Sequence, residues 1–200
     1  MGNIKMGNIK MSNIKMGNIK MSNINIFEEE DYKSGDGMMT SVWGPPMWHI
    51  LHTISFNYPI EPTEKDKINY YNYYKNLKNI LPCRYCRENL KKNLKKLPLN
   101  KAVFKNRETL SKWVYNLHEA VNKMLGKTSN LTYEMVRDRY EHFRSRCLNG
   151  REMSAKRETG CTKSLYGVKG KCVLTIVPKD TNTPSFKMDP KCKIKKISKK

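Results

Sequence analysis

The 200-residue chain lacks any run of 18 apolar residues, the length that a membrane-spanning helix needs. Its first residues also lack the apolar stretch of a secretory signal. Although the chain begins Met1-Gly2, Met6 stands where an N-myristoylation signal requires Ser or Thr. We therefore expect no membrane span and no lipid anchor, and we expect the six cysteines to work in a reducing, intracellular setting.

Acidic residues are scarce, with 18 Asp and Glu against 39 Lys and Arg, so the formal net charge is +21. Such a charge attracts nucleic acid or anionic surfaces. A biased coding composition, rich in Asn, Ile and Lys, produces the same excess without any such role. The charge, together with the run KKNLKK at 91–96, therefore supports one alternative only: a basic, non-enzymatic helical protein that binds nucleic acid.

The chain is expected to have three parts. Residues 1–25 repeat a five-residue unit, MGNIK or a close variant, which is too short for a solenoid and too rich in Gly, Ser and Asn for a stable helix. We predict a disordered arm and linker over 1–40, one folded domain over 41–147, and a basic, disordered tail with cysteines over 148–200. Within the tail, residues 161–177 have the composition of a short hairpin or an edge strand.

Residues 43–147 show the spacing of amphipathic helices. Pro45-Pro46 mark the start of the first helix and Tyr58-Pro59 its end, because proline suits the first helical turn and the residue before proline leaves the α region. Thr63 and Asp66 have the spacing of a capping box that opens a second helix. Pro82 interrupts the helical pattern after this second helix.

Three more helices follow. A third runs from about Cys83 to Leu97, Asn106 caps a fourth that Gly126 ends, and Thr132 opens a fifth that extends to Cys147. Apolar stripes at helical spacing mark the buried faces of the second, fourth and fifth helices, formed by Tyr70, Tyr74, Leu77, Leu81; Leu110, Trp113, Val114, Leu117, Val121, Met124, Leu125; and Val136, Tyr140, Phe143, Cys147. The predicted class is all-α, a compact helical bundle.

The stretch LPCRYCRE at 81–88 holds the one C-x-x-C of the chain. A structural zinc site needs four ligands, usually two such pairs or one pair with spaced histidines, and the other four cysteines stand singly, so no metal is expected. A staple between Cys83 and Cys86 would close a loop of roughly four residues and contribute only about 2 kcal/mol. A redox pair fits better, because Pro82 places both thiols at a helix start, where free N–H groups and the flanking Arg84 and Arg87 stabilise a thiolate.

The pair is the second of three motifs that follow one another along the chain: WGPPMWHILHTISFNYP (43–59), CRYC (83–86) and WVYNLHEAVNKMLGK (113–127). They resemble the Erv/ALR family of FAD-linked sulfhydryl oxidases. The WGPxxW opening and TYEMVRDRY (132–140) resemble its branch from large DNA viruses. The resemblance covers about residues 42–147, roughly half the chain, and identifies 41–147 as a FAD-binding sulfhydryl oxidase domain.

The resemblance implies a four-helix bundle with a fifth, crossing helix that holds FAD against the cysteine pair, in a homodimer. Electrons would pass from a protein dithiol to the Cys83–Cys86 disulfide, to FAD and to oxygen, which gives a protein disulfide and hydrogen peroxide. Cys86 would face the flavin, and Cys83 would exchange with the substrate. The family and its viral branch imply work in the host cytoplasm or in a virion.

The same resemblance implies the residues that bind FAD. Trp48 and His52, at i and i+4, match the family's W-x-x-x-H pair, and His118 and Asn122 resemble its H-N-x-V-N element, here with Glu119 in the second position. Further residues similar to family positions near the cofactor are Tyr58, Lys127 and Tyr140. Without the resemblance, these side chains would be interpreted as ordinary core or boundary residues.

The cysteines of the tail have two interpretations. Cys161 and Cys172 are candidates for a shuttle pair that carries electrons from the substrate, or else they form a structural staple of a small hairpin. The sequence leaves both interpretations open, and it assigns no role to Cys147 or Cys192.

Overall fold

The computed structural model describes residues 28–146 and 163–165 and the single residues 170, 172, 177, 181 and 189. The chain divides into two compact units, Met1–Gly35 and Asp36–Lys200. In the first unit, α1 (Glu29–Tyr32) is one helical turn, and Lys33 forms an ion pair with Glu29 at 3.5 Å. The predictions for the repeats at 1–25 and for Cys147, Cys161 and Cys192 concern residues outside this description.

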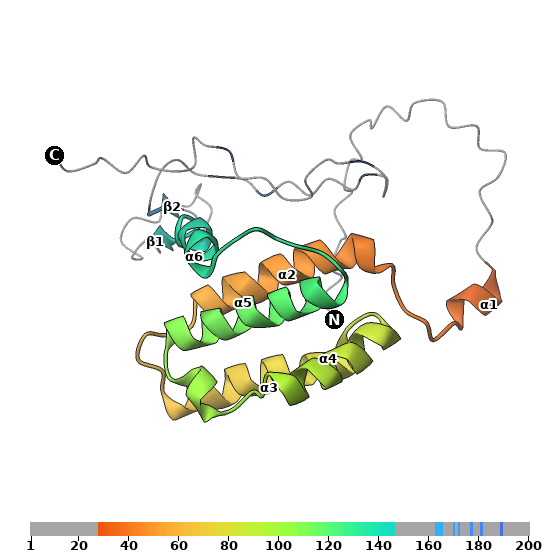
Figure 1. The fold of residues 1–200 in the computed structure, drawn as a ribbon, viewed down its shortest axis with the longest axis horizontal. Coiled ribbons are helices and arrows are strands. Elements are labelled where there is room, and N and C mark those ends of the chain that lie inside the picture. The colour runs from red at the N-terminus through yellow and green to blue at the C-terminus, as the bar shows by residue number, and fades with distance from the viewer. Residues whose placement is uncertain are drawn as a thin grey trace, which may run out of the picture. The chain divides into compact units, whose positions relative to one another are not determined.

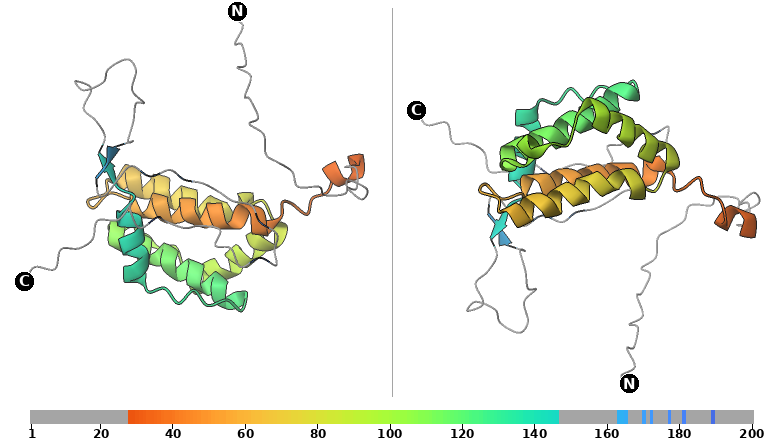
Figure 2. Two further views of the ribbon diagram at one scale, coloured as in Figure 1. Left: turned by 90° about the horizontal axis from the view of Figure 1, so that it is seen from above. Right: turned by 90° about the horizontal axis from the view of Figure 1, so that it is seen from below.

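The second unit is an all-α bundle. Its four main helices are α2 (Thr40–Phe56), α3 (Glu64–Ile80), α4 (Arg84–Lys96) and α5 (Arg107–Met124). Figure 1 shows α2 running beside α5, and α3 beside α4. A short 3₁₀ turn, η2 (Lys101–Phe104), joins α4 to α5, and α6 (Tyr133–Glu141) crosses the α2–α5 pair at a steep angle (Figure 2). The predicted four-helix bundle with a fifth, crossing helix is confirmed.

Three predicted helix starts carry the expected caps. The Thr63 side chain accepts a hydrogen bond from the Asp66 N–H, and the Asp66 carboxylate accepts one from the Thr63 N–H, which completes a capping box. Asn106 and Thr132 cap α5 and α6 in the same way through their side-chain oxygens. These caps fix where the connecting segments end, because they satisfy N–H groups that the first helical turn leaves free.

The predicted start of the first helix is wrong by five residues. Helix α2 begins at Thr40, so Pro45 and Pro46 lie inside it rather than at its first turn. The two prolines cannot donate to the carbonyls of Ser41 and Val42, four residues earlier. Both of these residues are exposed, so water can satisfy their carbonyls and the helix continues past the prolines.

The fifth helix is also shorter than predicted, because α6 ends at Glu141 rather than near Cys147. The Arg144 guanidinium donates to the Phe56 carbonyl at 2.6 Å and to the Glu141 carboxylate, which holds the chain in a turn against the end of α2. Phe143, assigned to the buried stripe, is 36% exposed. Met124 and Leu125, at the end of the α5 stripe, are likewise exposed, at 46% and 56%.

A small two-stranded pair follows α6. Strand β1 (Ser145–Arg146) pairs antiparallel with β2 (Lys163–Ser164). Strand β2 falls within the tail segment 161–177, most of which lies outside the described residues, and its partner β1 belongs to a segment predicted as helix. Within the described part of the chain, no helix is long and apolar enough to cross a membrane.

The core lies between the four main helices. Its fully or nearly fully buried side chains come from all of them and from η2, and they are Leu51, Tyr58, Tyr74, Leu77, Leu90, Val103, Phe104, Leu110, Trp113, Val114 and Leu117. A second, smaller cluster of Phe56, Tyr133 and Val136 attaches α6 to the end of α2. Helix α2 packs against both α5 and α6.

Candidate active site

The cysteine pair lies at the start of α4, as predicted. Cys83 is the N-cap residue, and its Sγ accepts a hydrogen bond from the Cys86 N–H at 3.3 Å. Both cysteines are half-buried and neither is in a disulfide. A sulfur in this position receives the positive end of the helix dipole together with a backbone donor, which favours its thiolate form.

The segment Asp36–Thr40, which leads into α2 and ends at its first residue, lies against this pair, and we call it the strap. The Met38 N–H donates to the Pro82 carbonyl at 2.6 Å, and Gly37 forms an antiparallel bridge with Cys83. Gly37 has a φ of +96°, and a Cβ there would stand 2.3 Å from the Pro82 oxygen. Only glycine allows this close approach. The composition places these residues in the linker, but they pack with the bundle.

The two ends of the strap also reach the C-x-x-C segment. The Thr40 hydroxyl lies 3.8 Å from Cys86 Sγ, within hydrogen-bond reach for sulfur. At the other end, Asp36 lies 3.8 Å from the Arg84 guanidinium, although both side chains are largely exposed, so this ion pair contributes little. The strap thus contacts the residue before the pair and both of its cysteines.

Hydrogen bonds shift the pKa values of the Cys83 and Cys86 thiols in opposite directions. Partial burial raises the pKa of Cys83, but hydrogen bonds from the Cys86 side chain, the Cys86 N–H and Thr40 outweigh it, so the pKa is lowered from its usual value. Burial raises the pKa of Cys86, and its hydrogen bond to Cys83 raises it further. Cys83 is therefore the thiol that ionises first.

A cluster of aromatic and histidine rings lies farther along α2. Trp48 stacks on His118 of α5, with ring centroids 4.0 Å apart and an interplanar angle of 5°. His52 Nε2 and His118 Nδ1 are 3.1 Å apart and share a hydrogen bond. Three of the residues predicted to bind a cofactor therefore meet across the α2–α5 contact. Trp48 is eight residues, about 12 Å along the helix, from Thr40 at the cysteine pair.

Tyr140 of α6 joins the same cluster. Its ring lies 5.2 Å from that of His52 and stacks on Phe56 at 5.3 Å. Its hydroxyl is 3.3 Å from Nδ1 of His49, a histidine that lies outside the predicted site. The signal for His49 was present, because it stands three residues before His52 and so lies near it on the same helix.

Burial keeps the two central histidines neutral. Desolvation, followed by the positive charge of His118, lowers the pKa of His52 to about 3. Desolvation also lowers the pKa of His118 to about 4. The Nδ1 atom of His52, in a side chain only 3% exposed, has no hydrogen-bond partner. A buried polar atom without a partner is costly, and a bound molecule with a polar group would satisfy it.

The other three predicted cofactor residues lie outside this ring cluster. Tyr58 is 0% exposed, and its hydroxyl donates to the Phe104 carbonyl at 3.0 Å, so its side chain serves the core. The Asn122 amide donates to the Glu119 carboxylate at 3.0 Å, one turn beyond His118. Lys127 is exposed after the end of α5, and its N–H donates to the Asn122 carbonyl at 2.8 Å.

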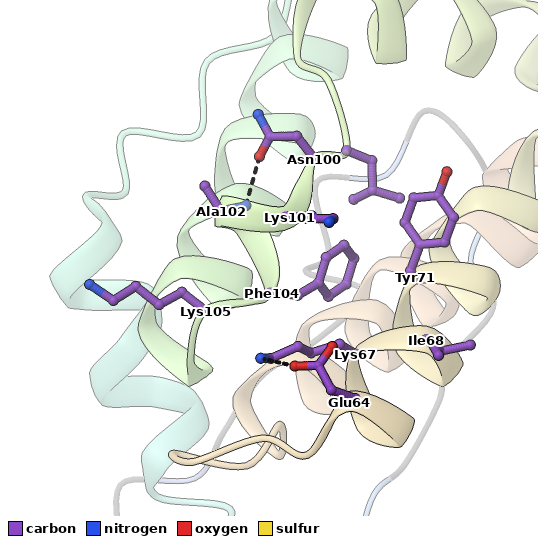
Figure 3. Close-up of a pocket in the computed structure, with 10 residues that line it drawn as sticks. Glu64, Lys67, Ile68, Tyr71, Asn100, Lys101, Ala102, Phe104 and Lys105 are labelled. Carbon is purple, nitrogen blue, oxygen red and sulfur yellow. Dashed lines mark hydrogen bonds and ion pairs between the residues drawn. The ribbon is translucent and has the colours of Figure 1, made fainter.

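A separate pocket of about 870 Å³ lies between the first half of α3 and the residues around η2. Figure 3 shows Tyr71 and Phe104 beside one another in it, where their rings make an edge-to-face contact, and Lys67 paired to Glu64. None of the predicted site residues lines this pocket. Among the residues that the structure describes, no three His, Cys, Asp or Glu side chains form a group suited to a metal ion.

The ordered motifs and this geometry agree with a comparison against protein families. Residues 45–141 match the model of the Erv1 / Alr family. This stretch is an Erv1/Alr domain. A probable FAD-linked sulfhydryl oxidase of Acanthamoeba polyphaga mimivirus is 41% identical to it over 96 residues, which cover 48% of this chain and 66% of that protein. The mitochondrial FAD-linked sulfhydryl oxidase of Saccharomyces cerevisiae is 28% identical over 96 residues, 48% of this chain and 49% of that protein.

The chain also aligns with a solved structure, the FAD binding domain of Erv1 from Saccharomyces cerevisiae. The sequence identity is 26% and the TM-score 0.47, over 52% of this chain and 95% of that chain. The matched region spans about half to just under two thirds of the length of the two curated relatives.

Proposed function

We propose that this chain is a FAD-dependent thiol oxidase that forms disulfide bonds in protein substrates. The observation that carries the proposal is the pair Cys83 and Cys86 at the start of α4, with a helix N–H and the Cys86 thiol stabilising the Cys83 sulfur. The Erv1/Alr match over residues 45–141 and the names of the matched relatives support the same reaction.

The ring cluster fits a flat, polar cofactor such as FAD. Trp48, His52 and His118 bring aromatic faces together, and His52 Nδ1 offers a buried polar atom without a partner. Tyr140 adds a ring from α6 that can stack on a planar group. We propose that these four residues hold FAD, with Asn122 and Lys127 toward its polar end and Tyr58 supporting the helices from the core.

The cysteines can carry out two successive thiol–disulfide exchanges. A substrate thiolate attacks Cys83 Sγ of the Cys83–Cys86 disulfide, a substrate–Cys83 mixed disulfide forms, and Cys86 leaves as a thiolate. The second substrate thiolate then attacks the substrate sulfur of this mixed disulfide, and Cys83 leaves. The substrate gains a disulfide, and the pair has gained two electrons and, from solvent or substrate, two protons.

The low pKa of Cys83 matters in the second exchange, because a thiol with a lower pKa is the faster leaving group. Bound FAD would supply the acceptor that takes the two electrons from the reduced pair and delivers them to oxygen as hydrogen peroxide. In this scheme Cys86 is the cysteine next to FAD, and Cys83 is the one that contacts the substrate.

The visible spectrum of the purified protein tests the proposal first. We expect flavin absorption that bleaches when a dithiol is added and recovers in air, with release of hydrogen peroxide. Cys86→Ser should abolish oxygen-dependent thiol oxidation and leave the flavin bound. Turnover retained by Cys86→Ser would refute the assigned roles, and protein that neither contains FAD nor takes it up would refute the proposed reaction.

Two finer expectations belong to the same proposal. A homodimer formed through α2 and α3 is supported by exposed apolar side chains on both helices, Ile50 (48%), Ile68 (58%) and Ile80 (67%), and light scattering of the purified protein tests it. A shuttle role for Cys161 and Cys172 is compatible with Cys172, which is exposed and free. The viral relative supports a viral origin, with work in a host cell or a virion.

The nucleic-acid alternative has no support from the matched relatives, which are named oxidases.

A further inference from the structure

The exposed face of α4 is strongly basic. Helix α4 carries six Lys and Arg in 13 residues and a single acidic residue, Glu88. Its buried side is formed by Leu90 and Asn93, and the exposed positions are Arg84, Tyr85, Glu88, Lys91, Lys92, Lys95 and Lys96. Five of these seven positions are cationic, so α4 presents a basic strip about 20 Å long to solvent.

The bundle itself does not neutralise this strip. Lys91 and Lys95, and likewise Lys92 and Lys96, are like-charge pairs at i and i+4, which destabilise a helix by a few tenths of a kcal/mol each. Among the described residues, no carboxylate forms an ion pair with any of the four lysines. The dipole favours cations only in the last turn, so it offsets the cost for Lys95 and Lys96 alone.

The strip is continuous with the reactive cysteines. Cys83 caps the helix that carries the lysines, and the two residues between the cysteines, Arg84 and Tyr85, are both exposed. The Tyr85 ring is 63% exposed and lies under the Arg84 guanidinium, which is 5.0 Å from the ring centroid. An exposed aromatic ring backed by a cation, directly between the cysteines, offers a contact site for a polypeptide that has reached Cys83.

We propose that the exposed face of α4 is the docking surface for the protein substrate, and that it selects dithiol polypeptides with acidic residues next to their cysteines. This inference rests on the proposed function and adds the substrate class to it. Acidic side chains would pair with Lys91, Lys92, Lys95 and Lys96 while the substrate thiol lies at Cys83. Such complementary charges raise the association rate by a factor of ten or more at low salt.

A polypeptide fits this surface better than a nucleic acid does. The strip ends at a pair of thiols whose exchange partner must itself carry sulfur, and a nucleic acid offers none. The strip also contains Glu88 among the cations, which would repel a continuous phosphate backbone and which a polypeptide of mixed charge can avoid.

Two synthetic dithiol peptides that differ only in Glu or Gln beside their cysteines test the inference in the full-length flavoprotein. At low salt we expect the Glu peptide to be oxidised with a kcat/KM about tenfold above that of the Gln peptide, and the ratio to approach one at high salt. In the variant Lys91→Gln/Lys92→Gln/Lys95→Gln/Lys96→Gln the ratio should approach one at any salt. Oxidation of dithiothreitol should be unchanged in that variant.

A matched variant controls for the overall charge. Lys65→Gln/Lys75→Gln/Lys101→Gln/Lys105→Gln removes the same four charges from exposed positions on α3, on η2 and just after it, and it should keep the tenfold preference. Equal loss of preference in both variants, or no preference in the unmodified protein, would overturn the inference.

A binding measurement tests the docking surface on α4 independently of thiol oxidation. Fluorescence anisotropy with the Glu peptide, its cysteines replaced by serine, should show at least fivefold weaker binding to the α4 variant than to the matched variant, whether or not the protein turns over. Failure of dithiothreitol oxidation with this binding difference intact would refute the oxidase and keep the surface. A DNA duplex that loses affinity for the α4 variant while the peptide preference stays would overturn the inference in favour of nucleic acid.

Discussion

Cys83 and Cys86 have the same side chain, and the atoms around them give them different acidities. Cys83 Sγ accepts hydrogen bonds from the Cys86 N–H, in the first turn of α4, and from the Cys86 thiol, and these bonds lower its pKa against the effect of burial. Cys86 donates one of those bonds, so burial and the donated bond raise its pKa. Alkylation of the reduced protein should therefore begin at Cys83.

Thr40 is the residue whose removal most directly tests this arrangement. Its hydroxyl lies 3.8 Å from Cys86 Sγ and lowers the pKa of both thiols. We expect Thr40→Val to raise the pH at which each cysteine reacts with iodoacetamide, and Thr40→Ser to restore it, because serine keeps the hydroxyl. Mass spectrometry of the alkylated peptides gives the two pH profiles separately. Identical profiles for Thr40→Val and the unmodified protein would show that the hydroxyl has no effect.

Residue patterns predicted part of this site and missed part of it. Trp48, His52 and His118 follow from motifs within single helices, and the structure brings them into contact. Thr40 and Gly37 lie in a Gly- and Ser-containing segment that looks like a linker. Their contacts are with residues more than 40 positions later, and nothing in the local pattern of a strap encodes its distant partner.

Among the secondary-structure elements, the start of α2 is linked to the start of α4 by the strap, which contacts Pro82, Cys83 and Cys86, and Gly37 is the critical position of the strap. Gly37→Ala would require an unfavourable φ of +96° and a Cβ 2.3 Å from the Pro82 oxygen. We expect a loss of about 1–3 kcal/mol in the free energy of unfolding, measured by urea denaturation. The alkylation of Cys83 should change with it, because the bridge to Gly37 is lost.

Gly35→Ala is the matched control for this strap variant. A Cβ at Gly35 would meet nothing within 4 Å, and the same substitution two residues earlier should leave stability within about 0.5 kcal/mol. Equal stability of the two variants would show that the close approach at Pro82 is not required.

Helix ends were predictable where side chains cap them and unpredictable where they do not. Thr63, Asn106 and Thr132 satisfy free N–H groups locally, so their sequence signals and the observed starts agree. The start of α2 has no side-chain cap, and the end of α6 depends on Arg144 binding the distant Phe56 carbonyl. Tertiary contacts decided these two boundaries.

For the whole molecule, the buried histidine pair couples stability to pH. The folded-state pKa values of His52 and His118, about 3 and about 4, lie below the ordinary value of 6.5. The unfolded chain therefore binds more protons as the pH falls, so the pair's contribution is fully present above pH 6.5 and is lost progressively below it. At pH 5 the loss is up to about 2 kcal/mol for each histidine.

Urea denaturation of the cofactor-free protein at pH 7 and at pH 5 measures this effect. The drop in unfolding free energy should be smaller in His52→Gln/His118→Gln than in the unmodified protein. His142→Gln, which changes a histidine at the end of α6 outside the pair, should keep the full drop. A drop that is the same in the double variant would show that other groups control the pH dependence.

Cys83 is both the N-cap of α4 and the sulfur that the substrate attacks, so disulfide exchange at Cys83 changes the stability of the first helical turn. Each time Cys83 is joined to another sulfur, its ability to accept the Cys86 N–H weakens, and the first turn of α4 loses its cap. The first turn of α4 should therefore open more often when Cys83 is in a disulfide than when both cysteines are reduced. The amide proton of Cys86 becomes an internal reporter, which should exchange with solvent faster in the mixed disulfide than in the reduced protein.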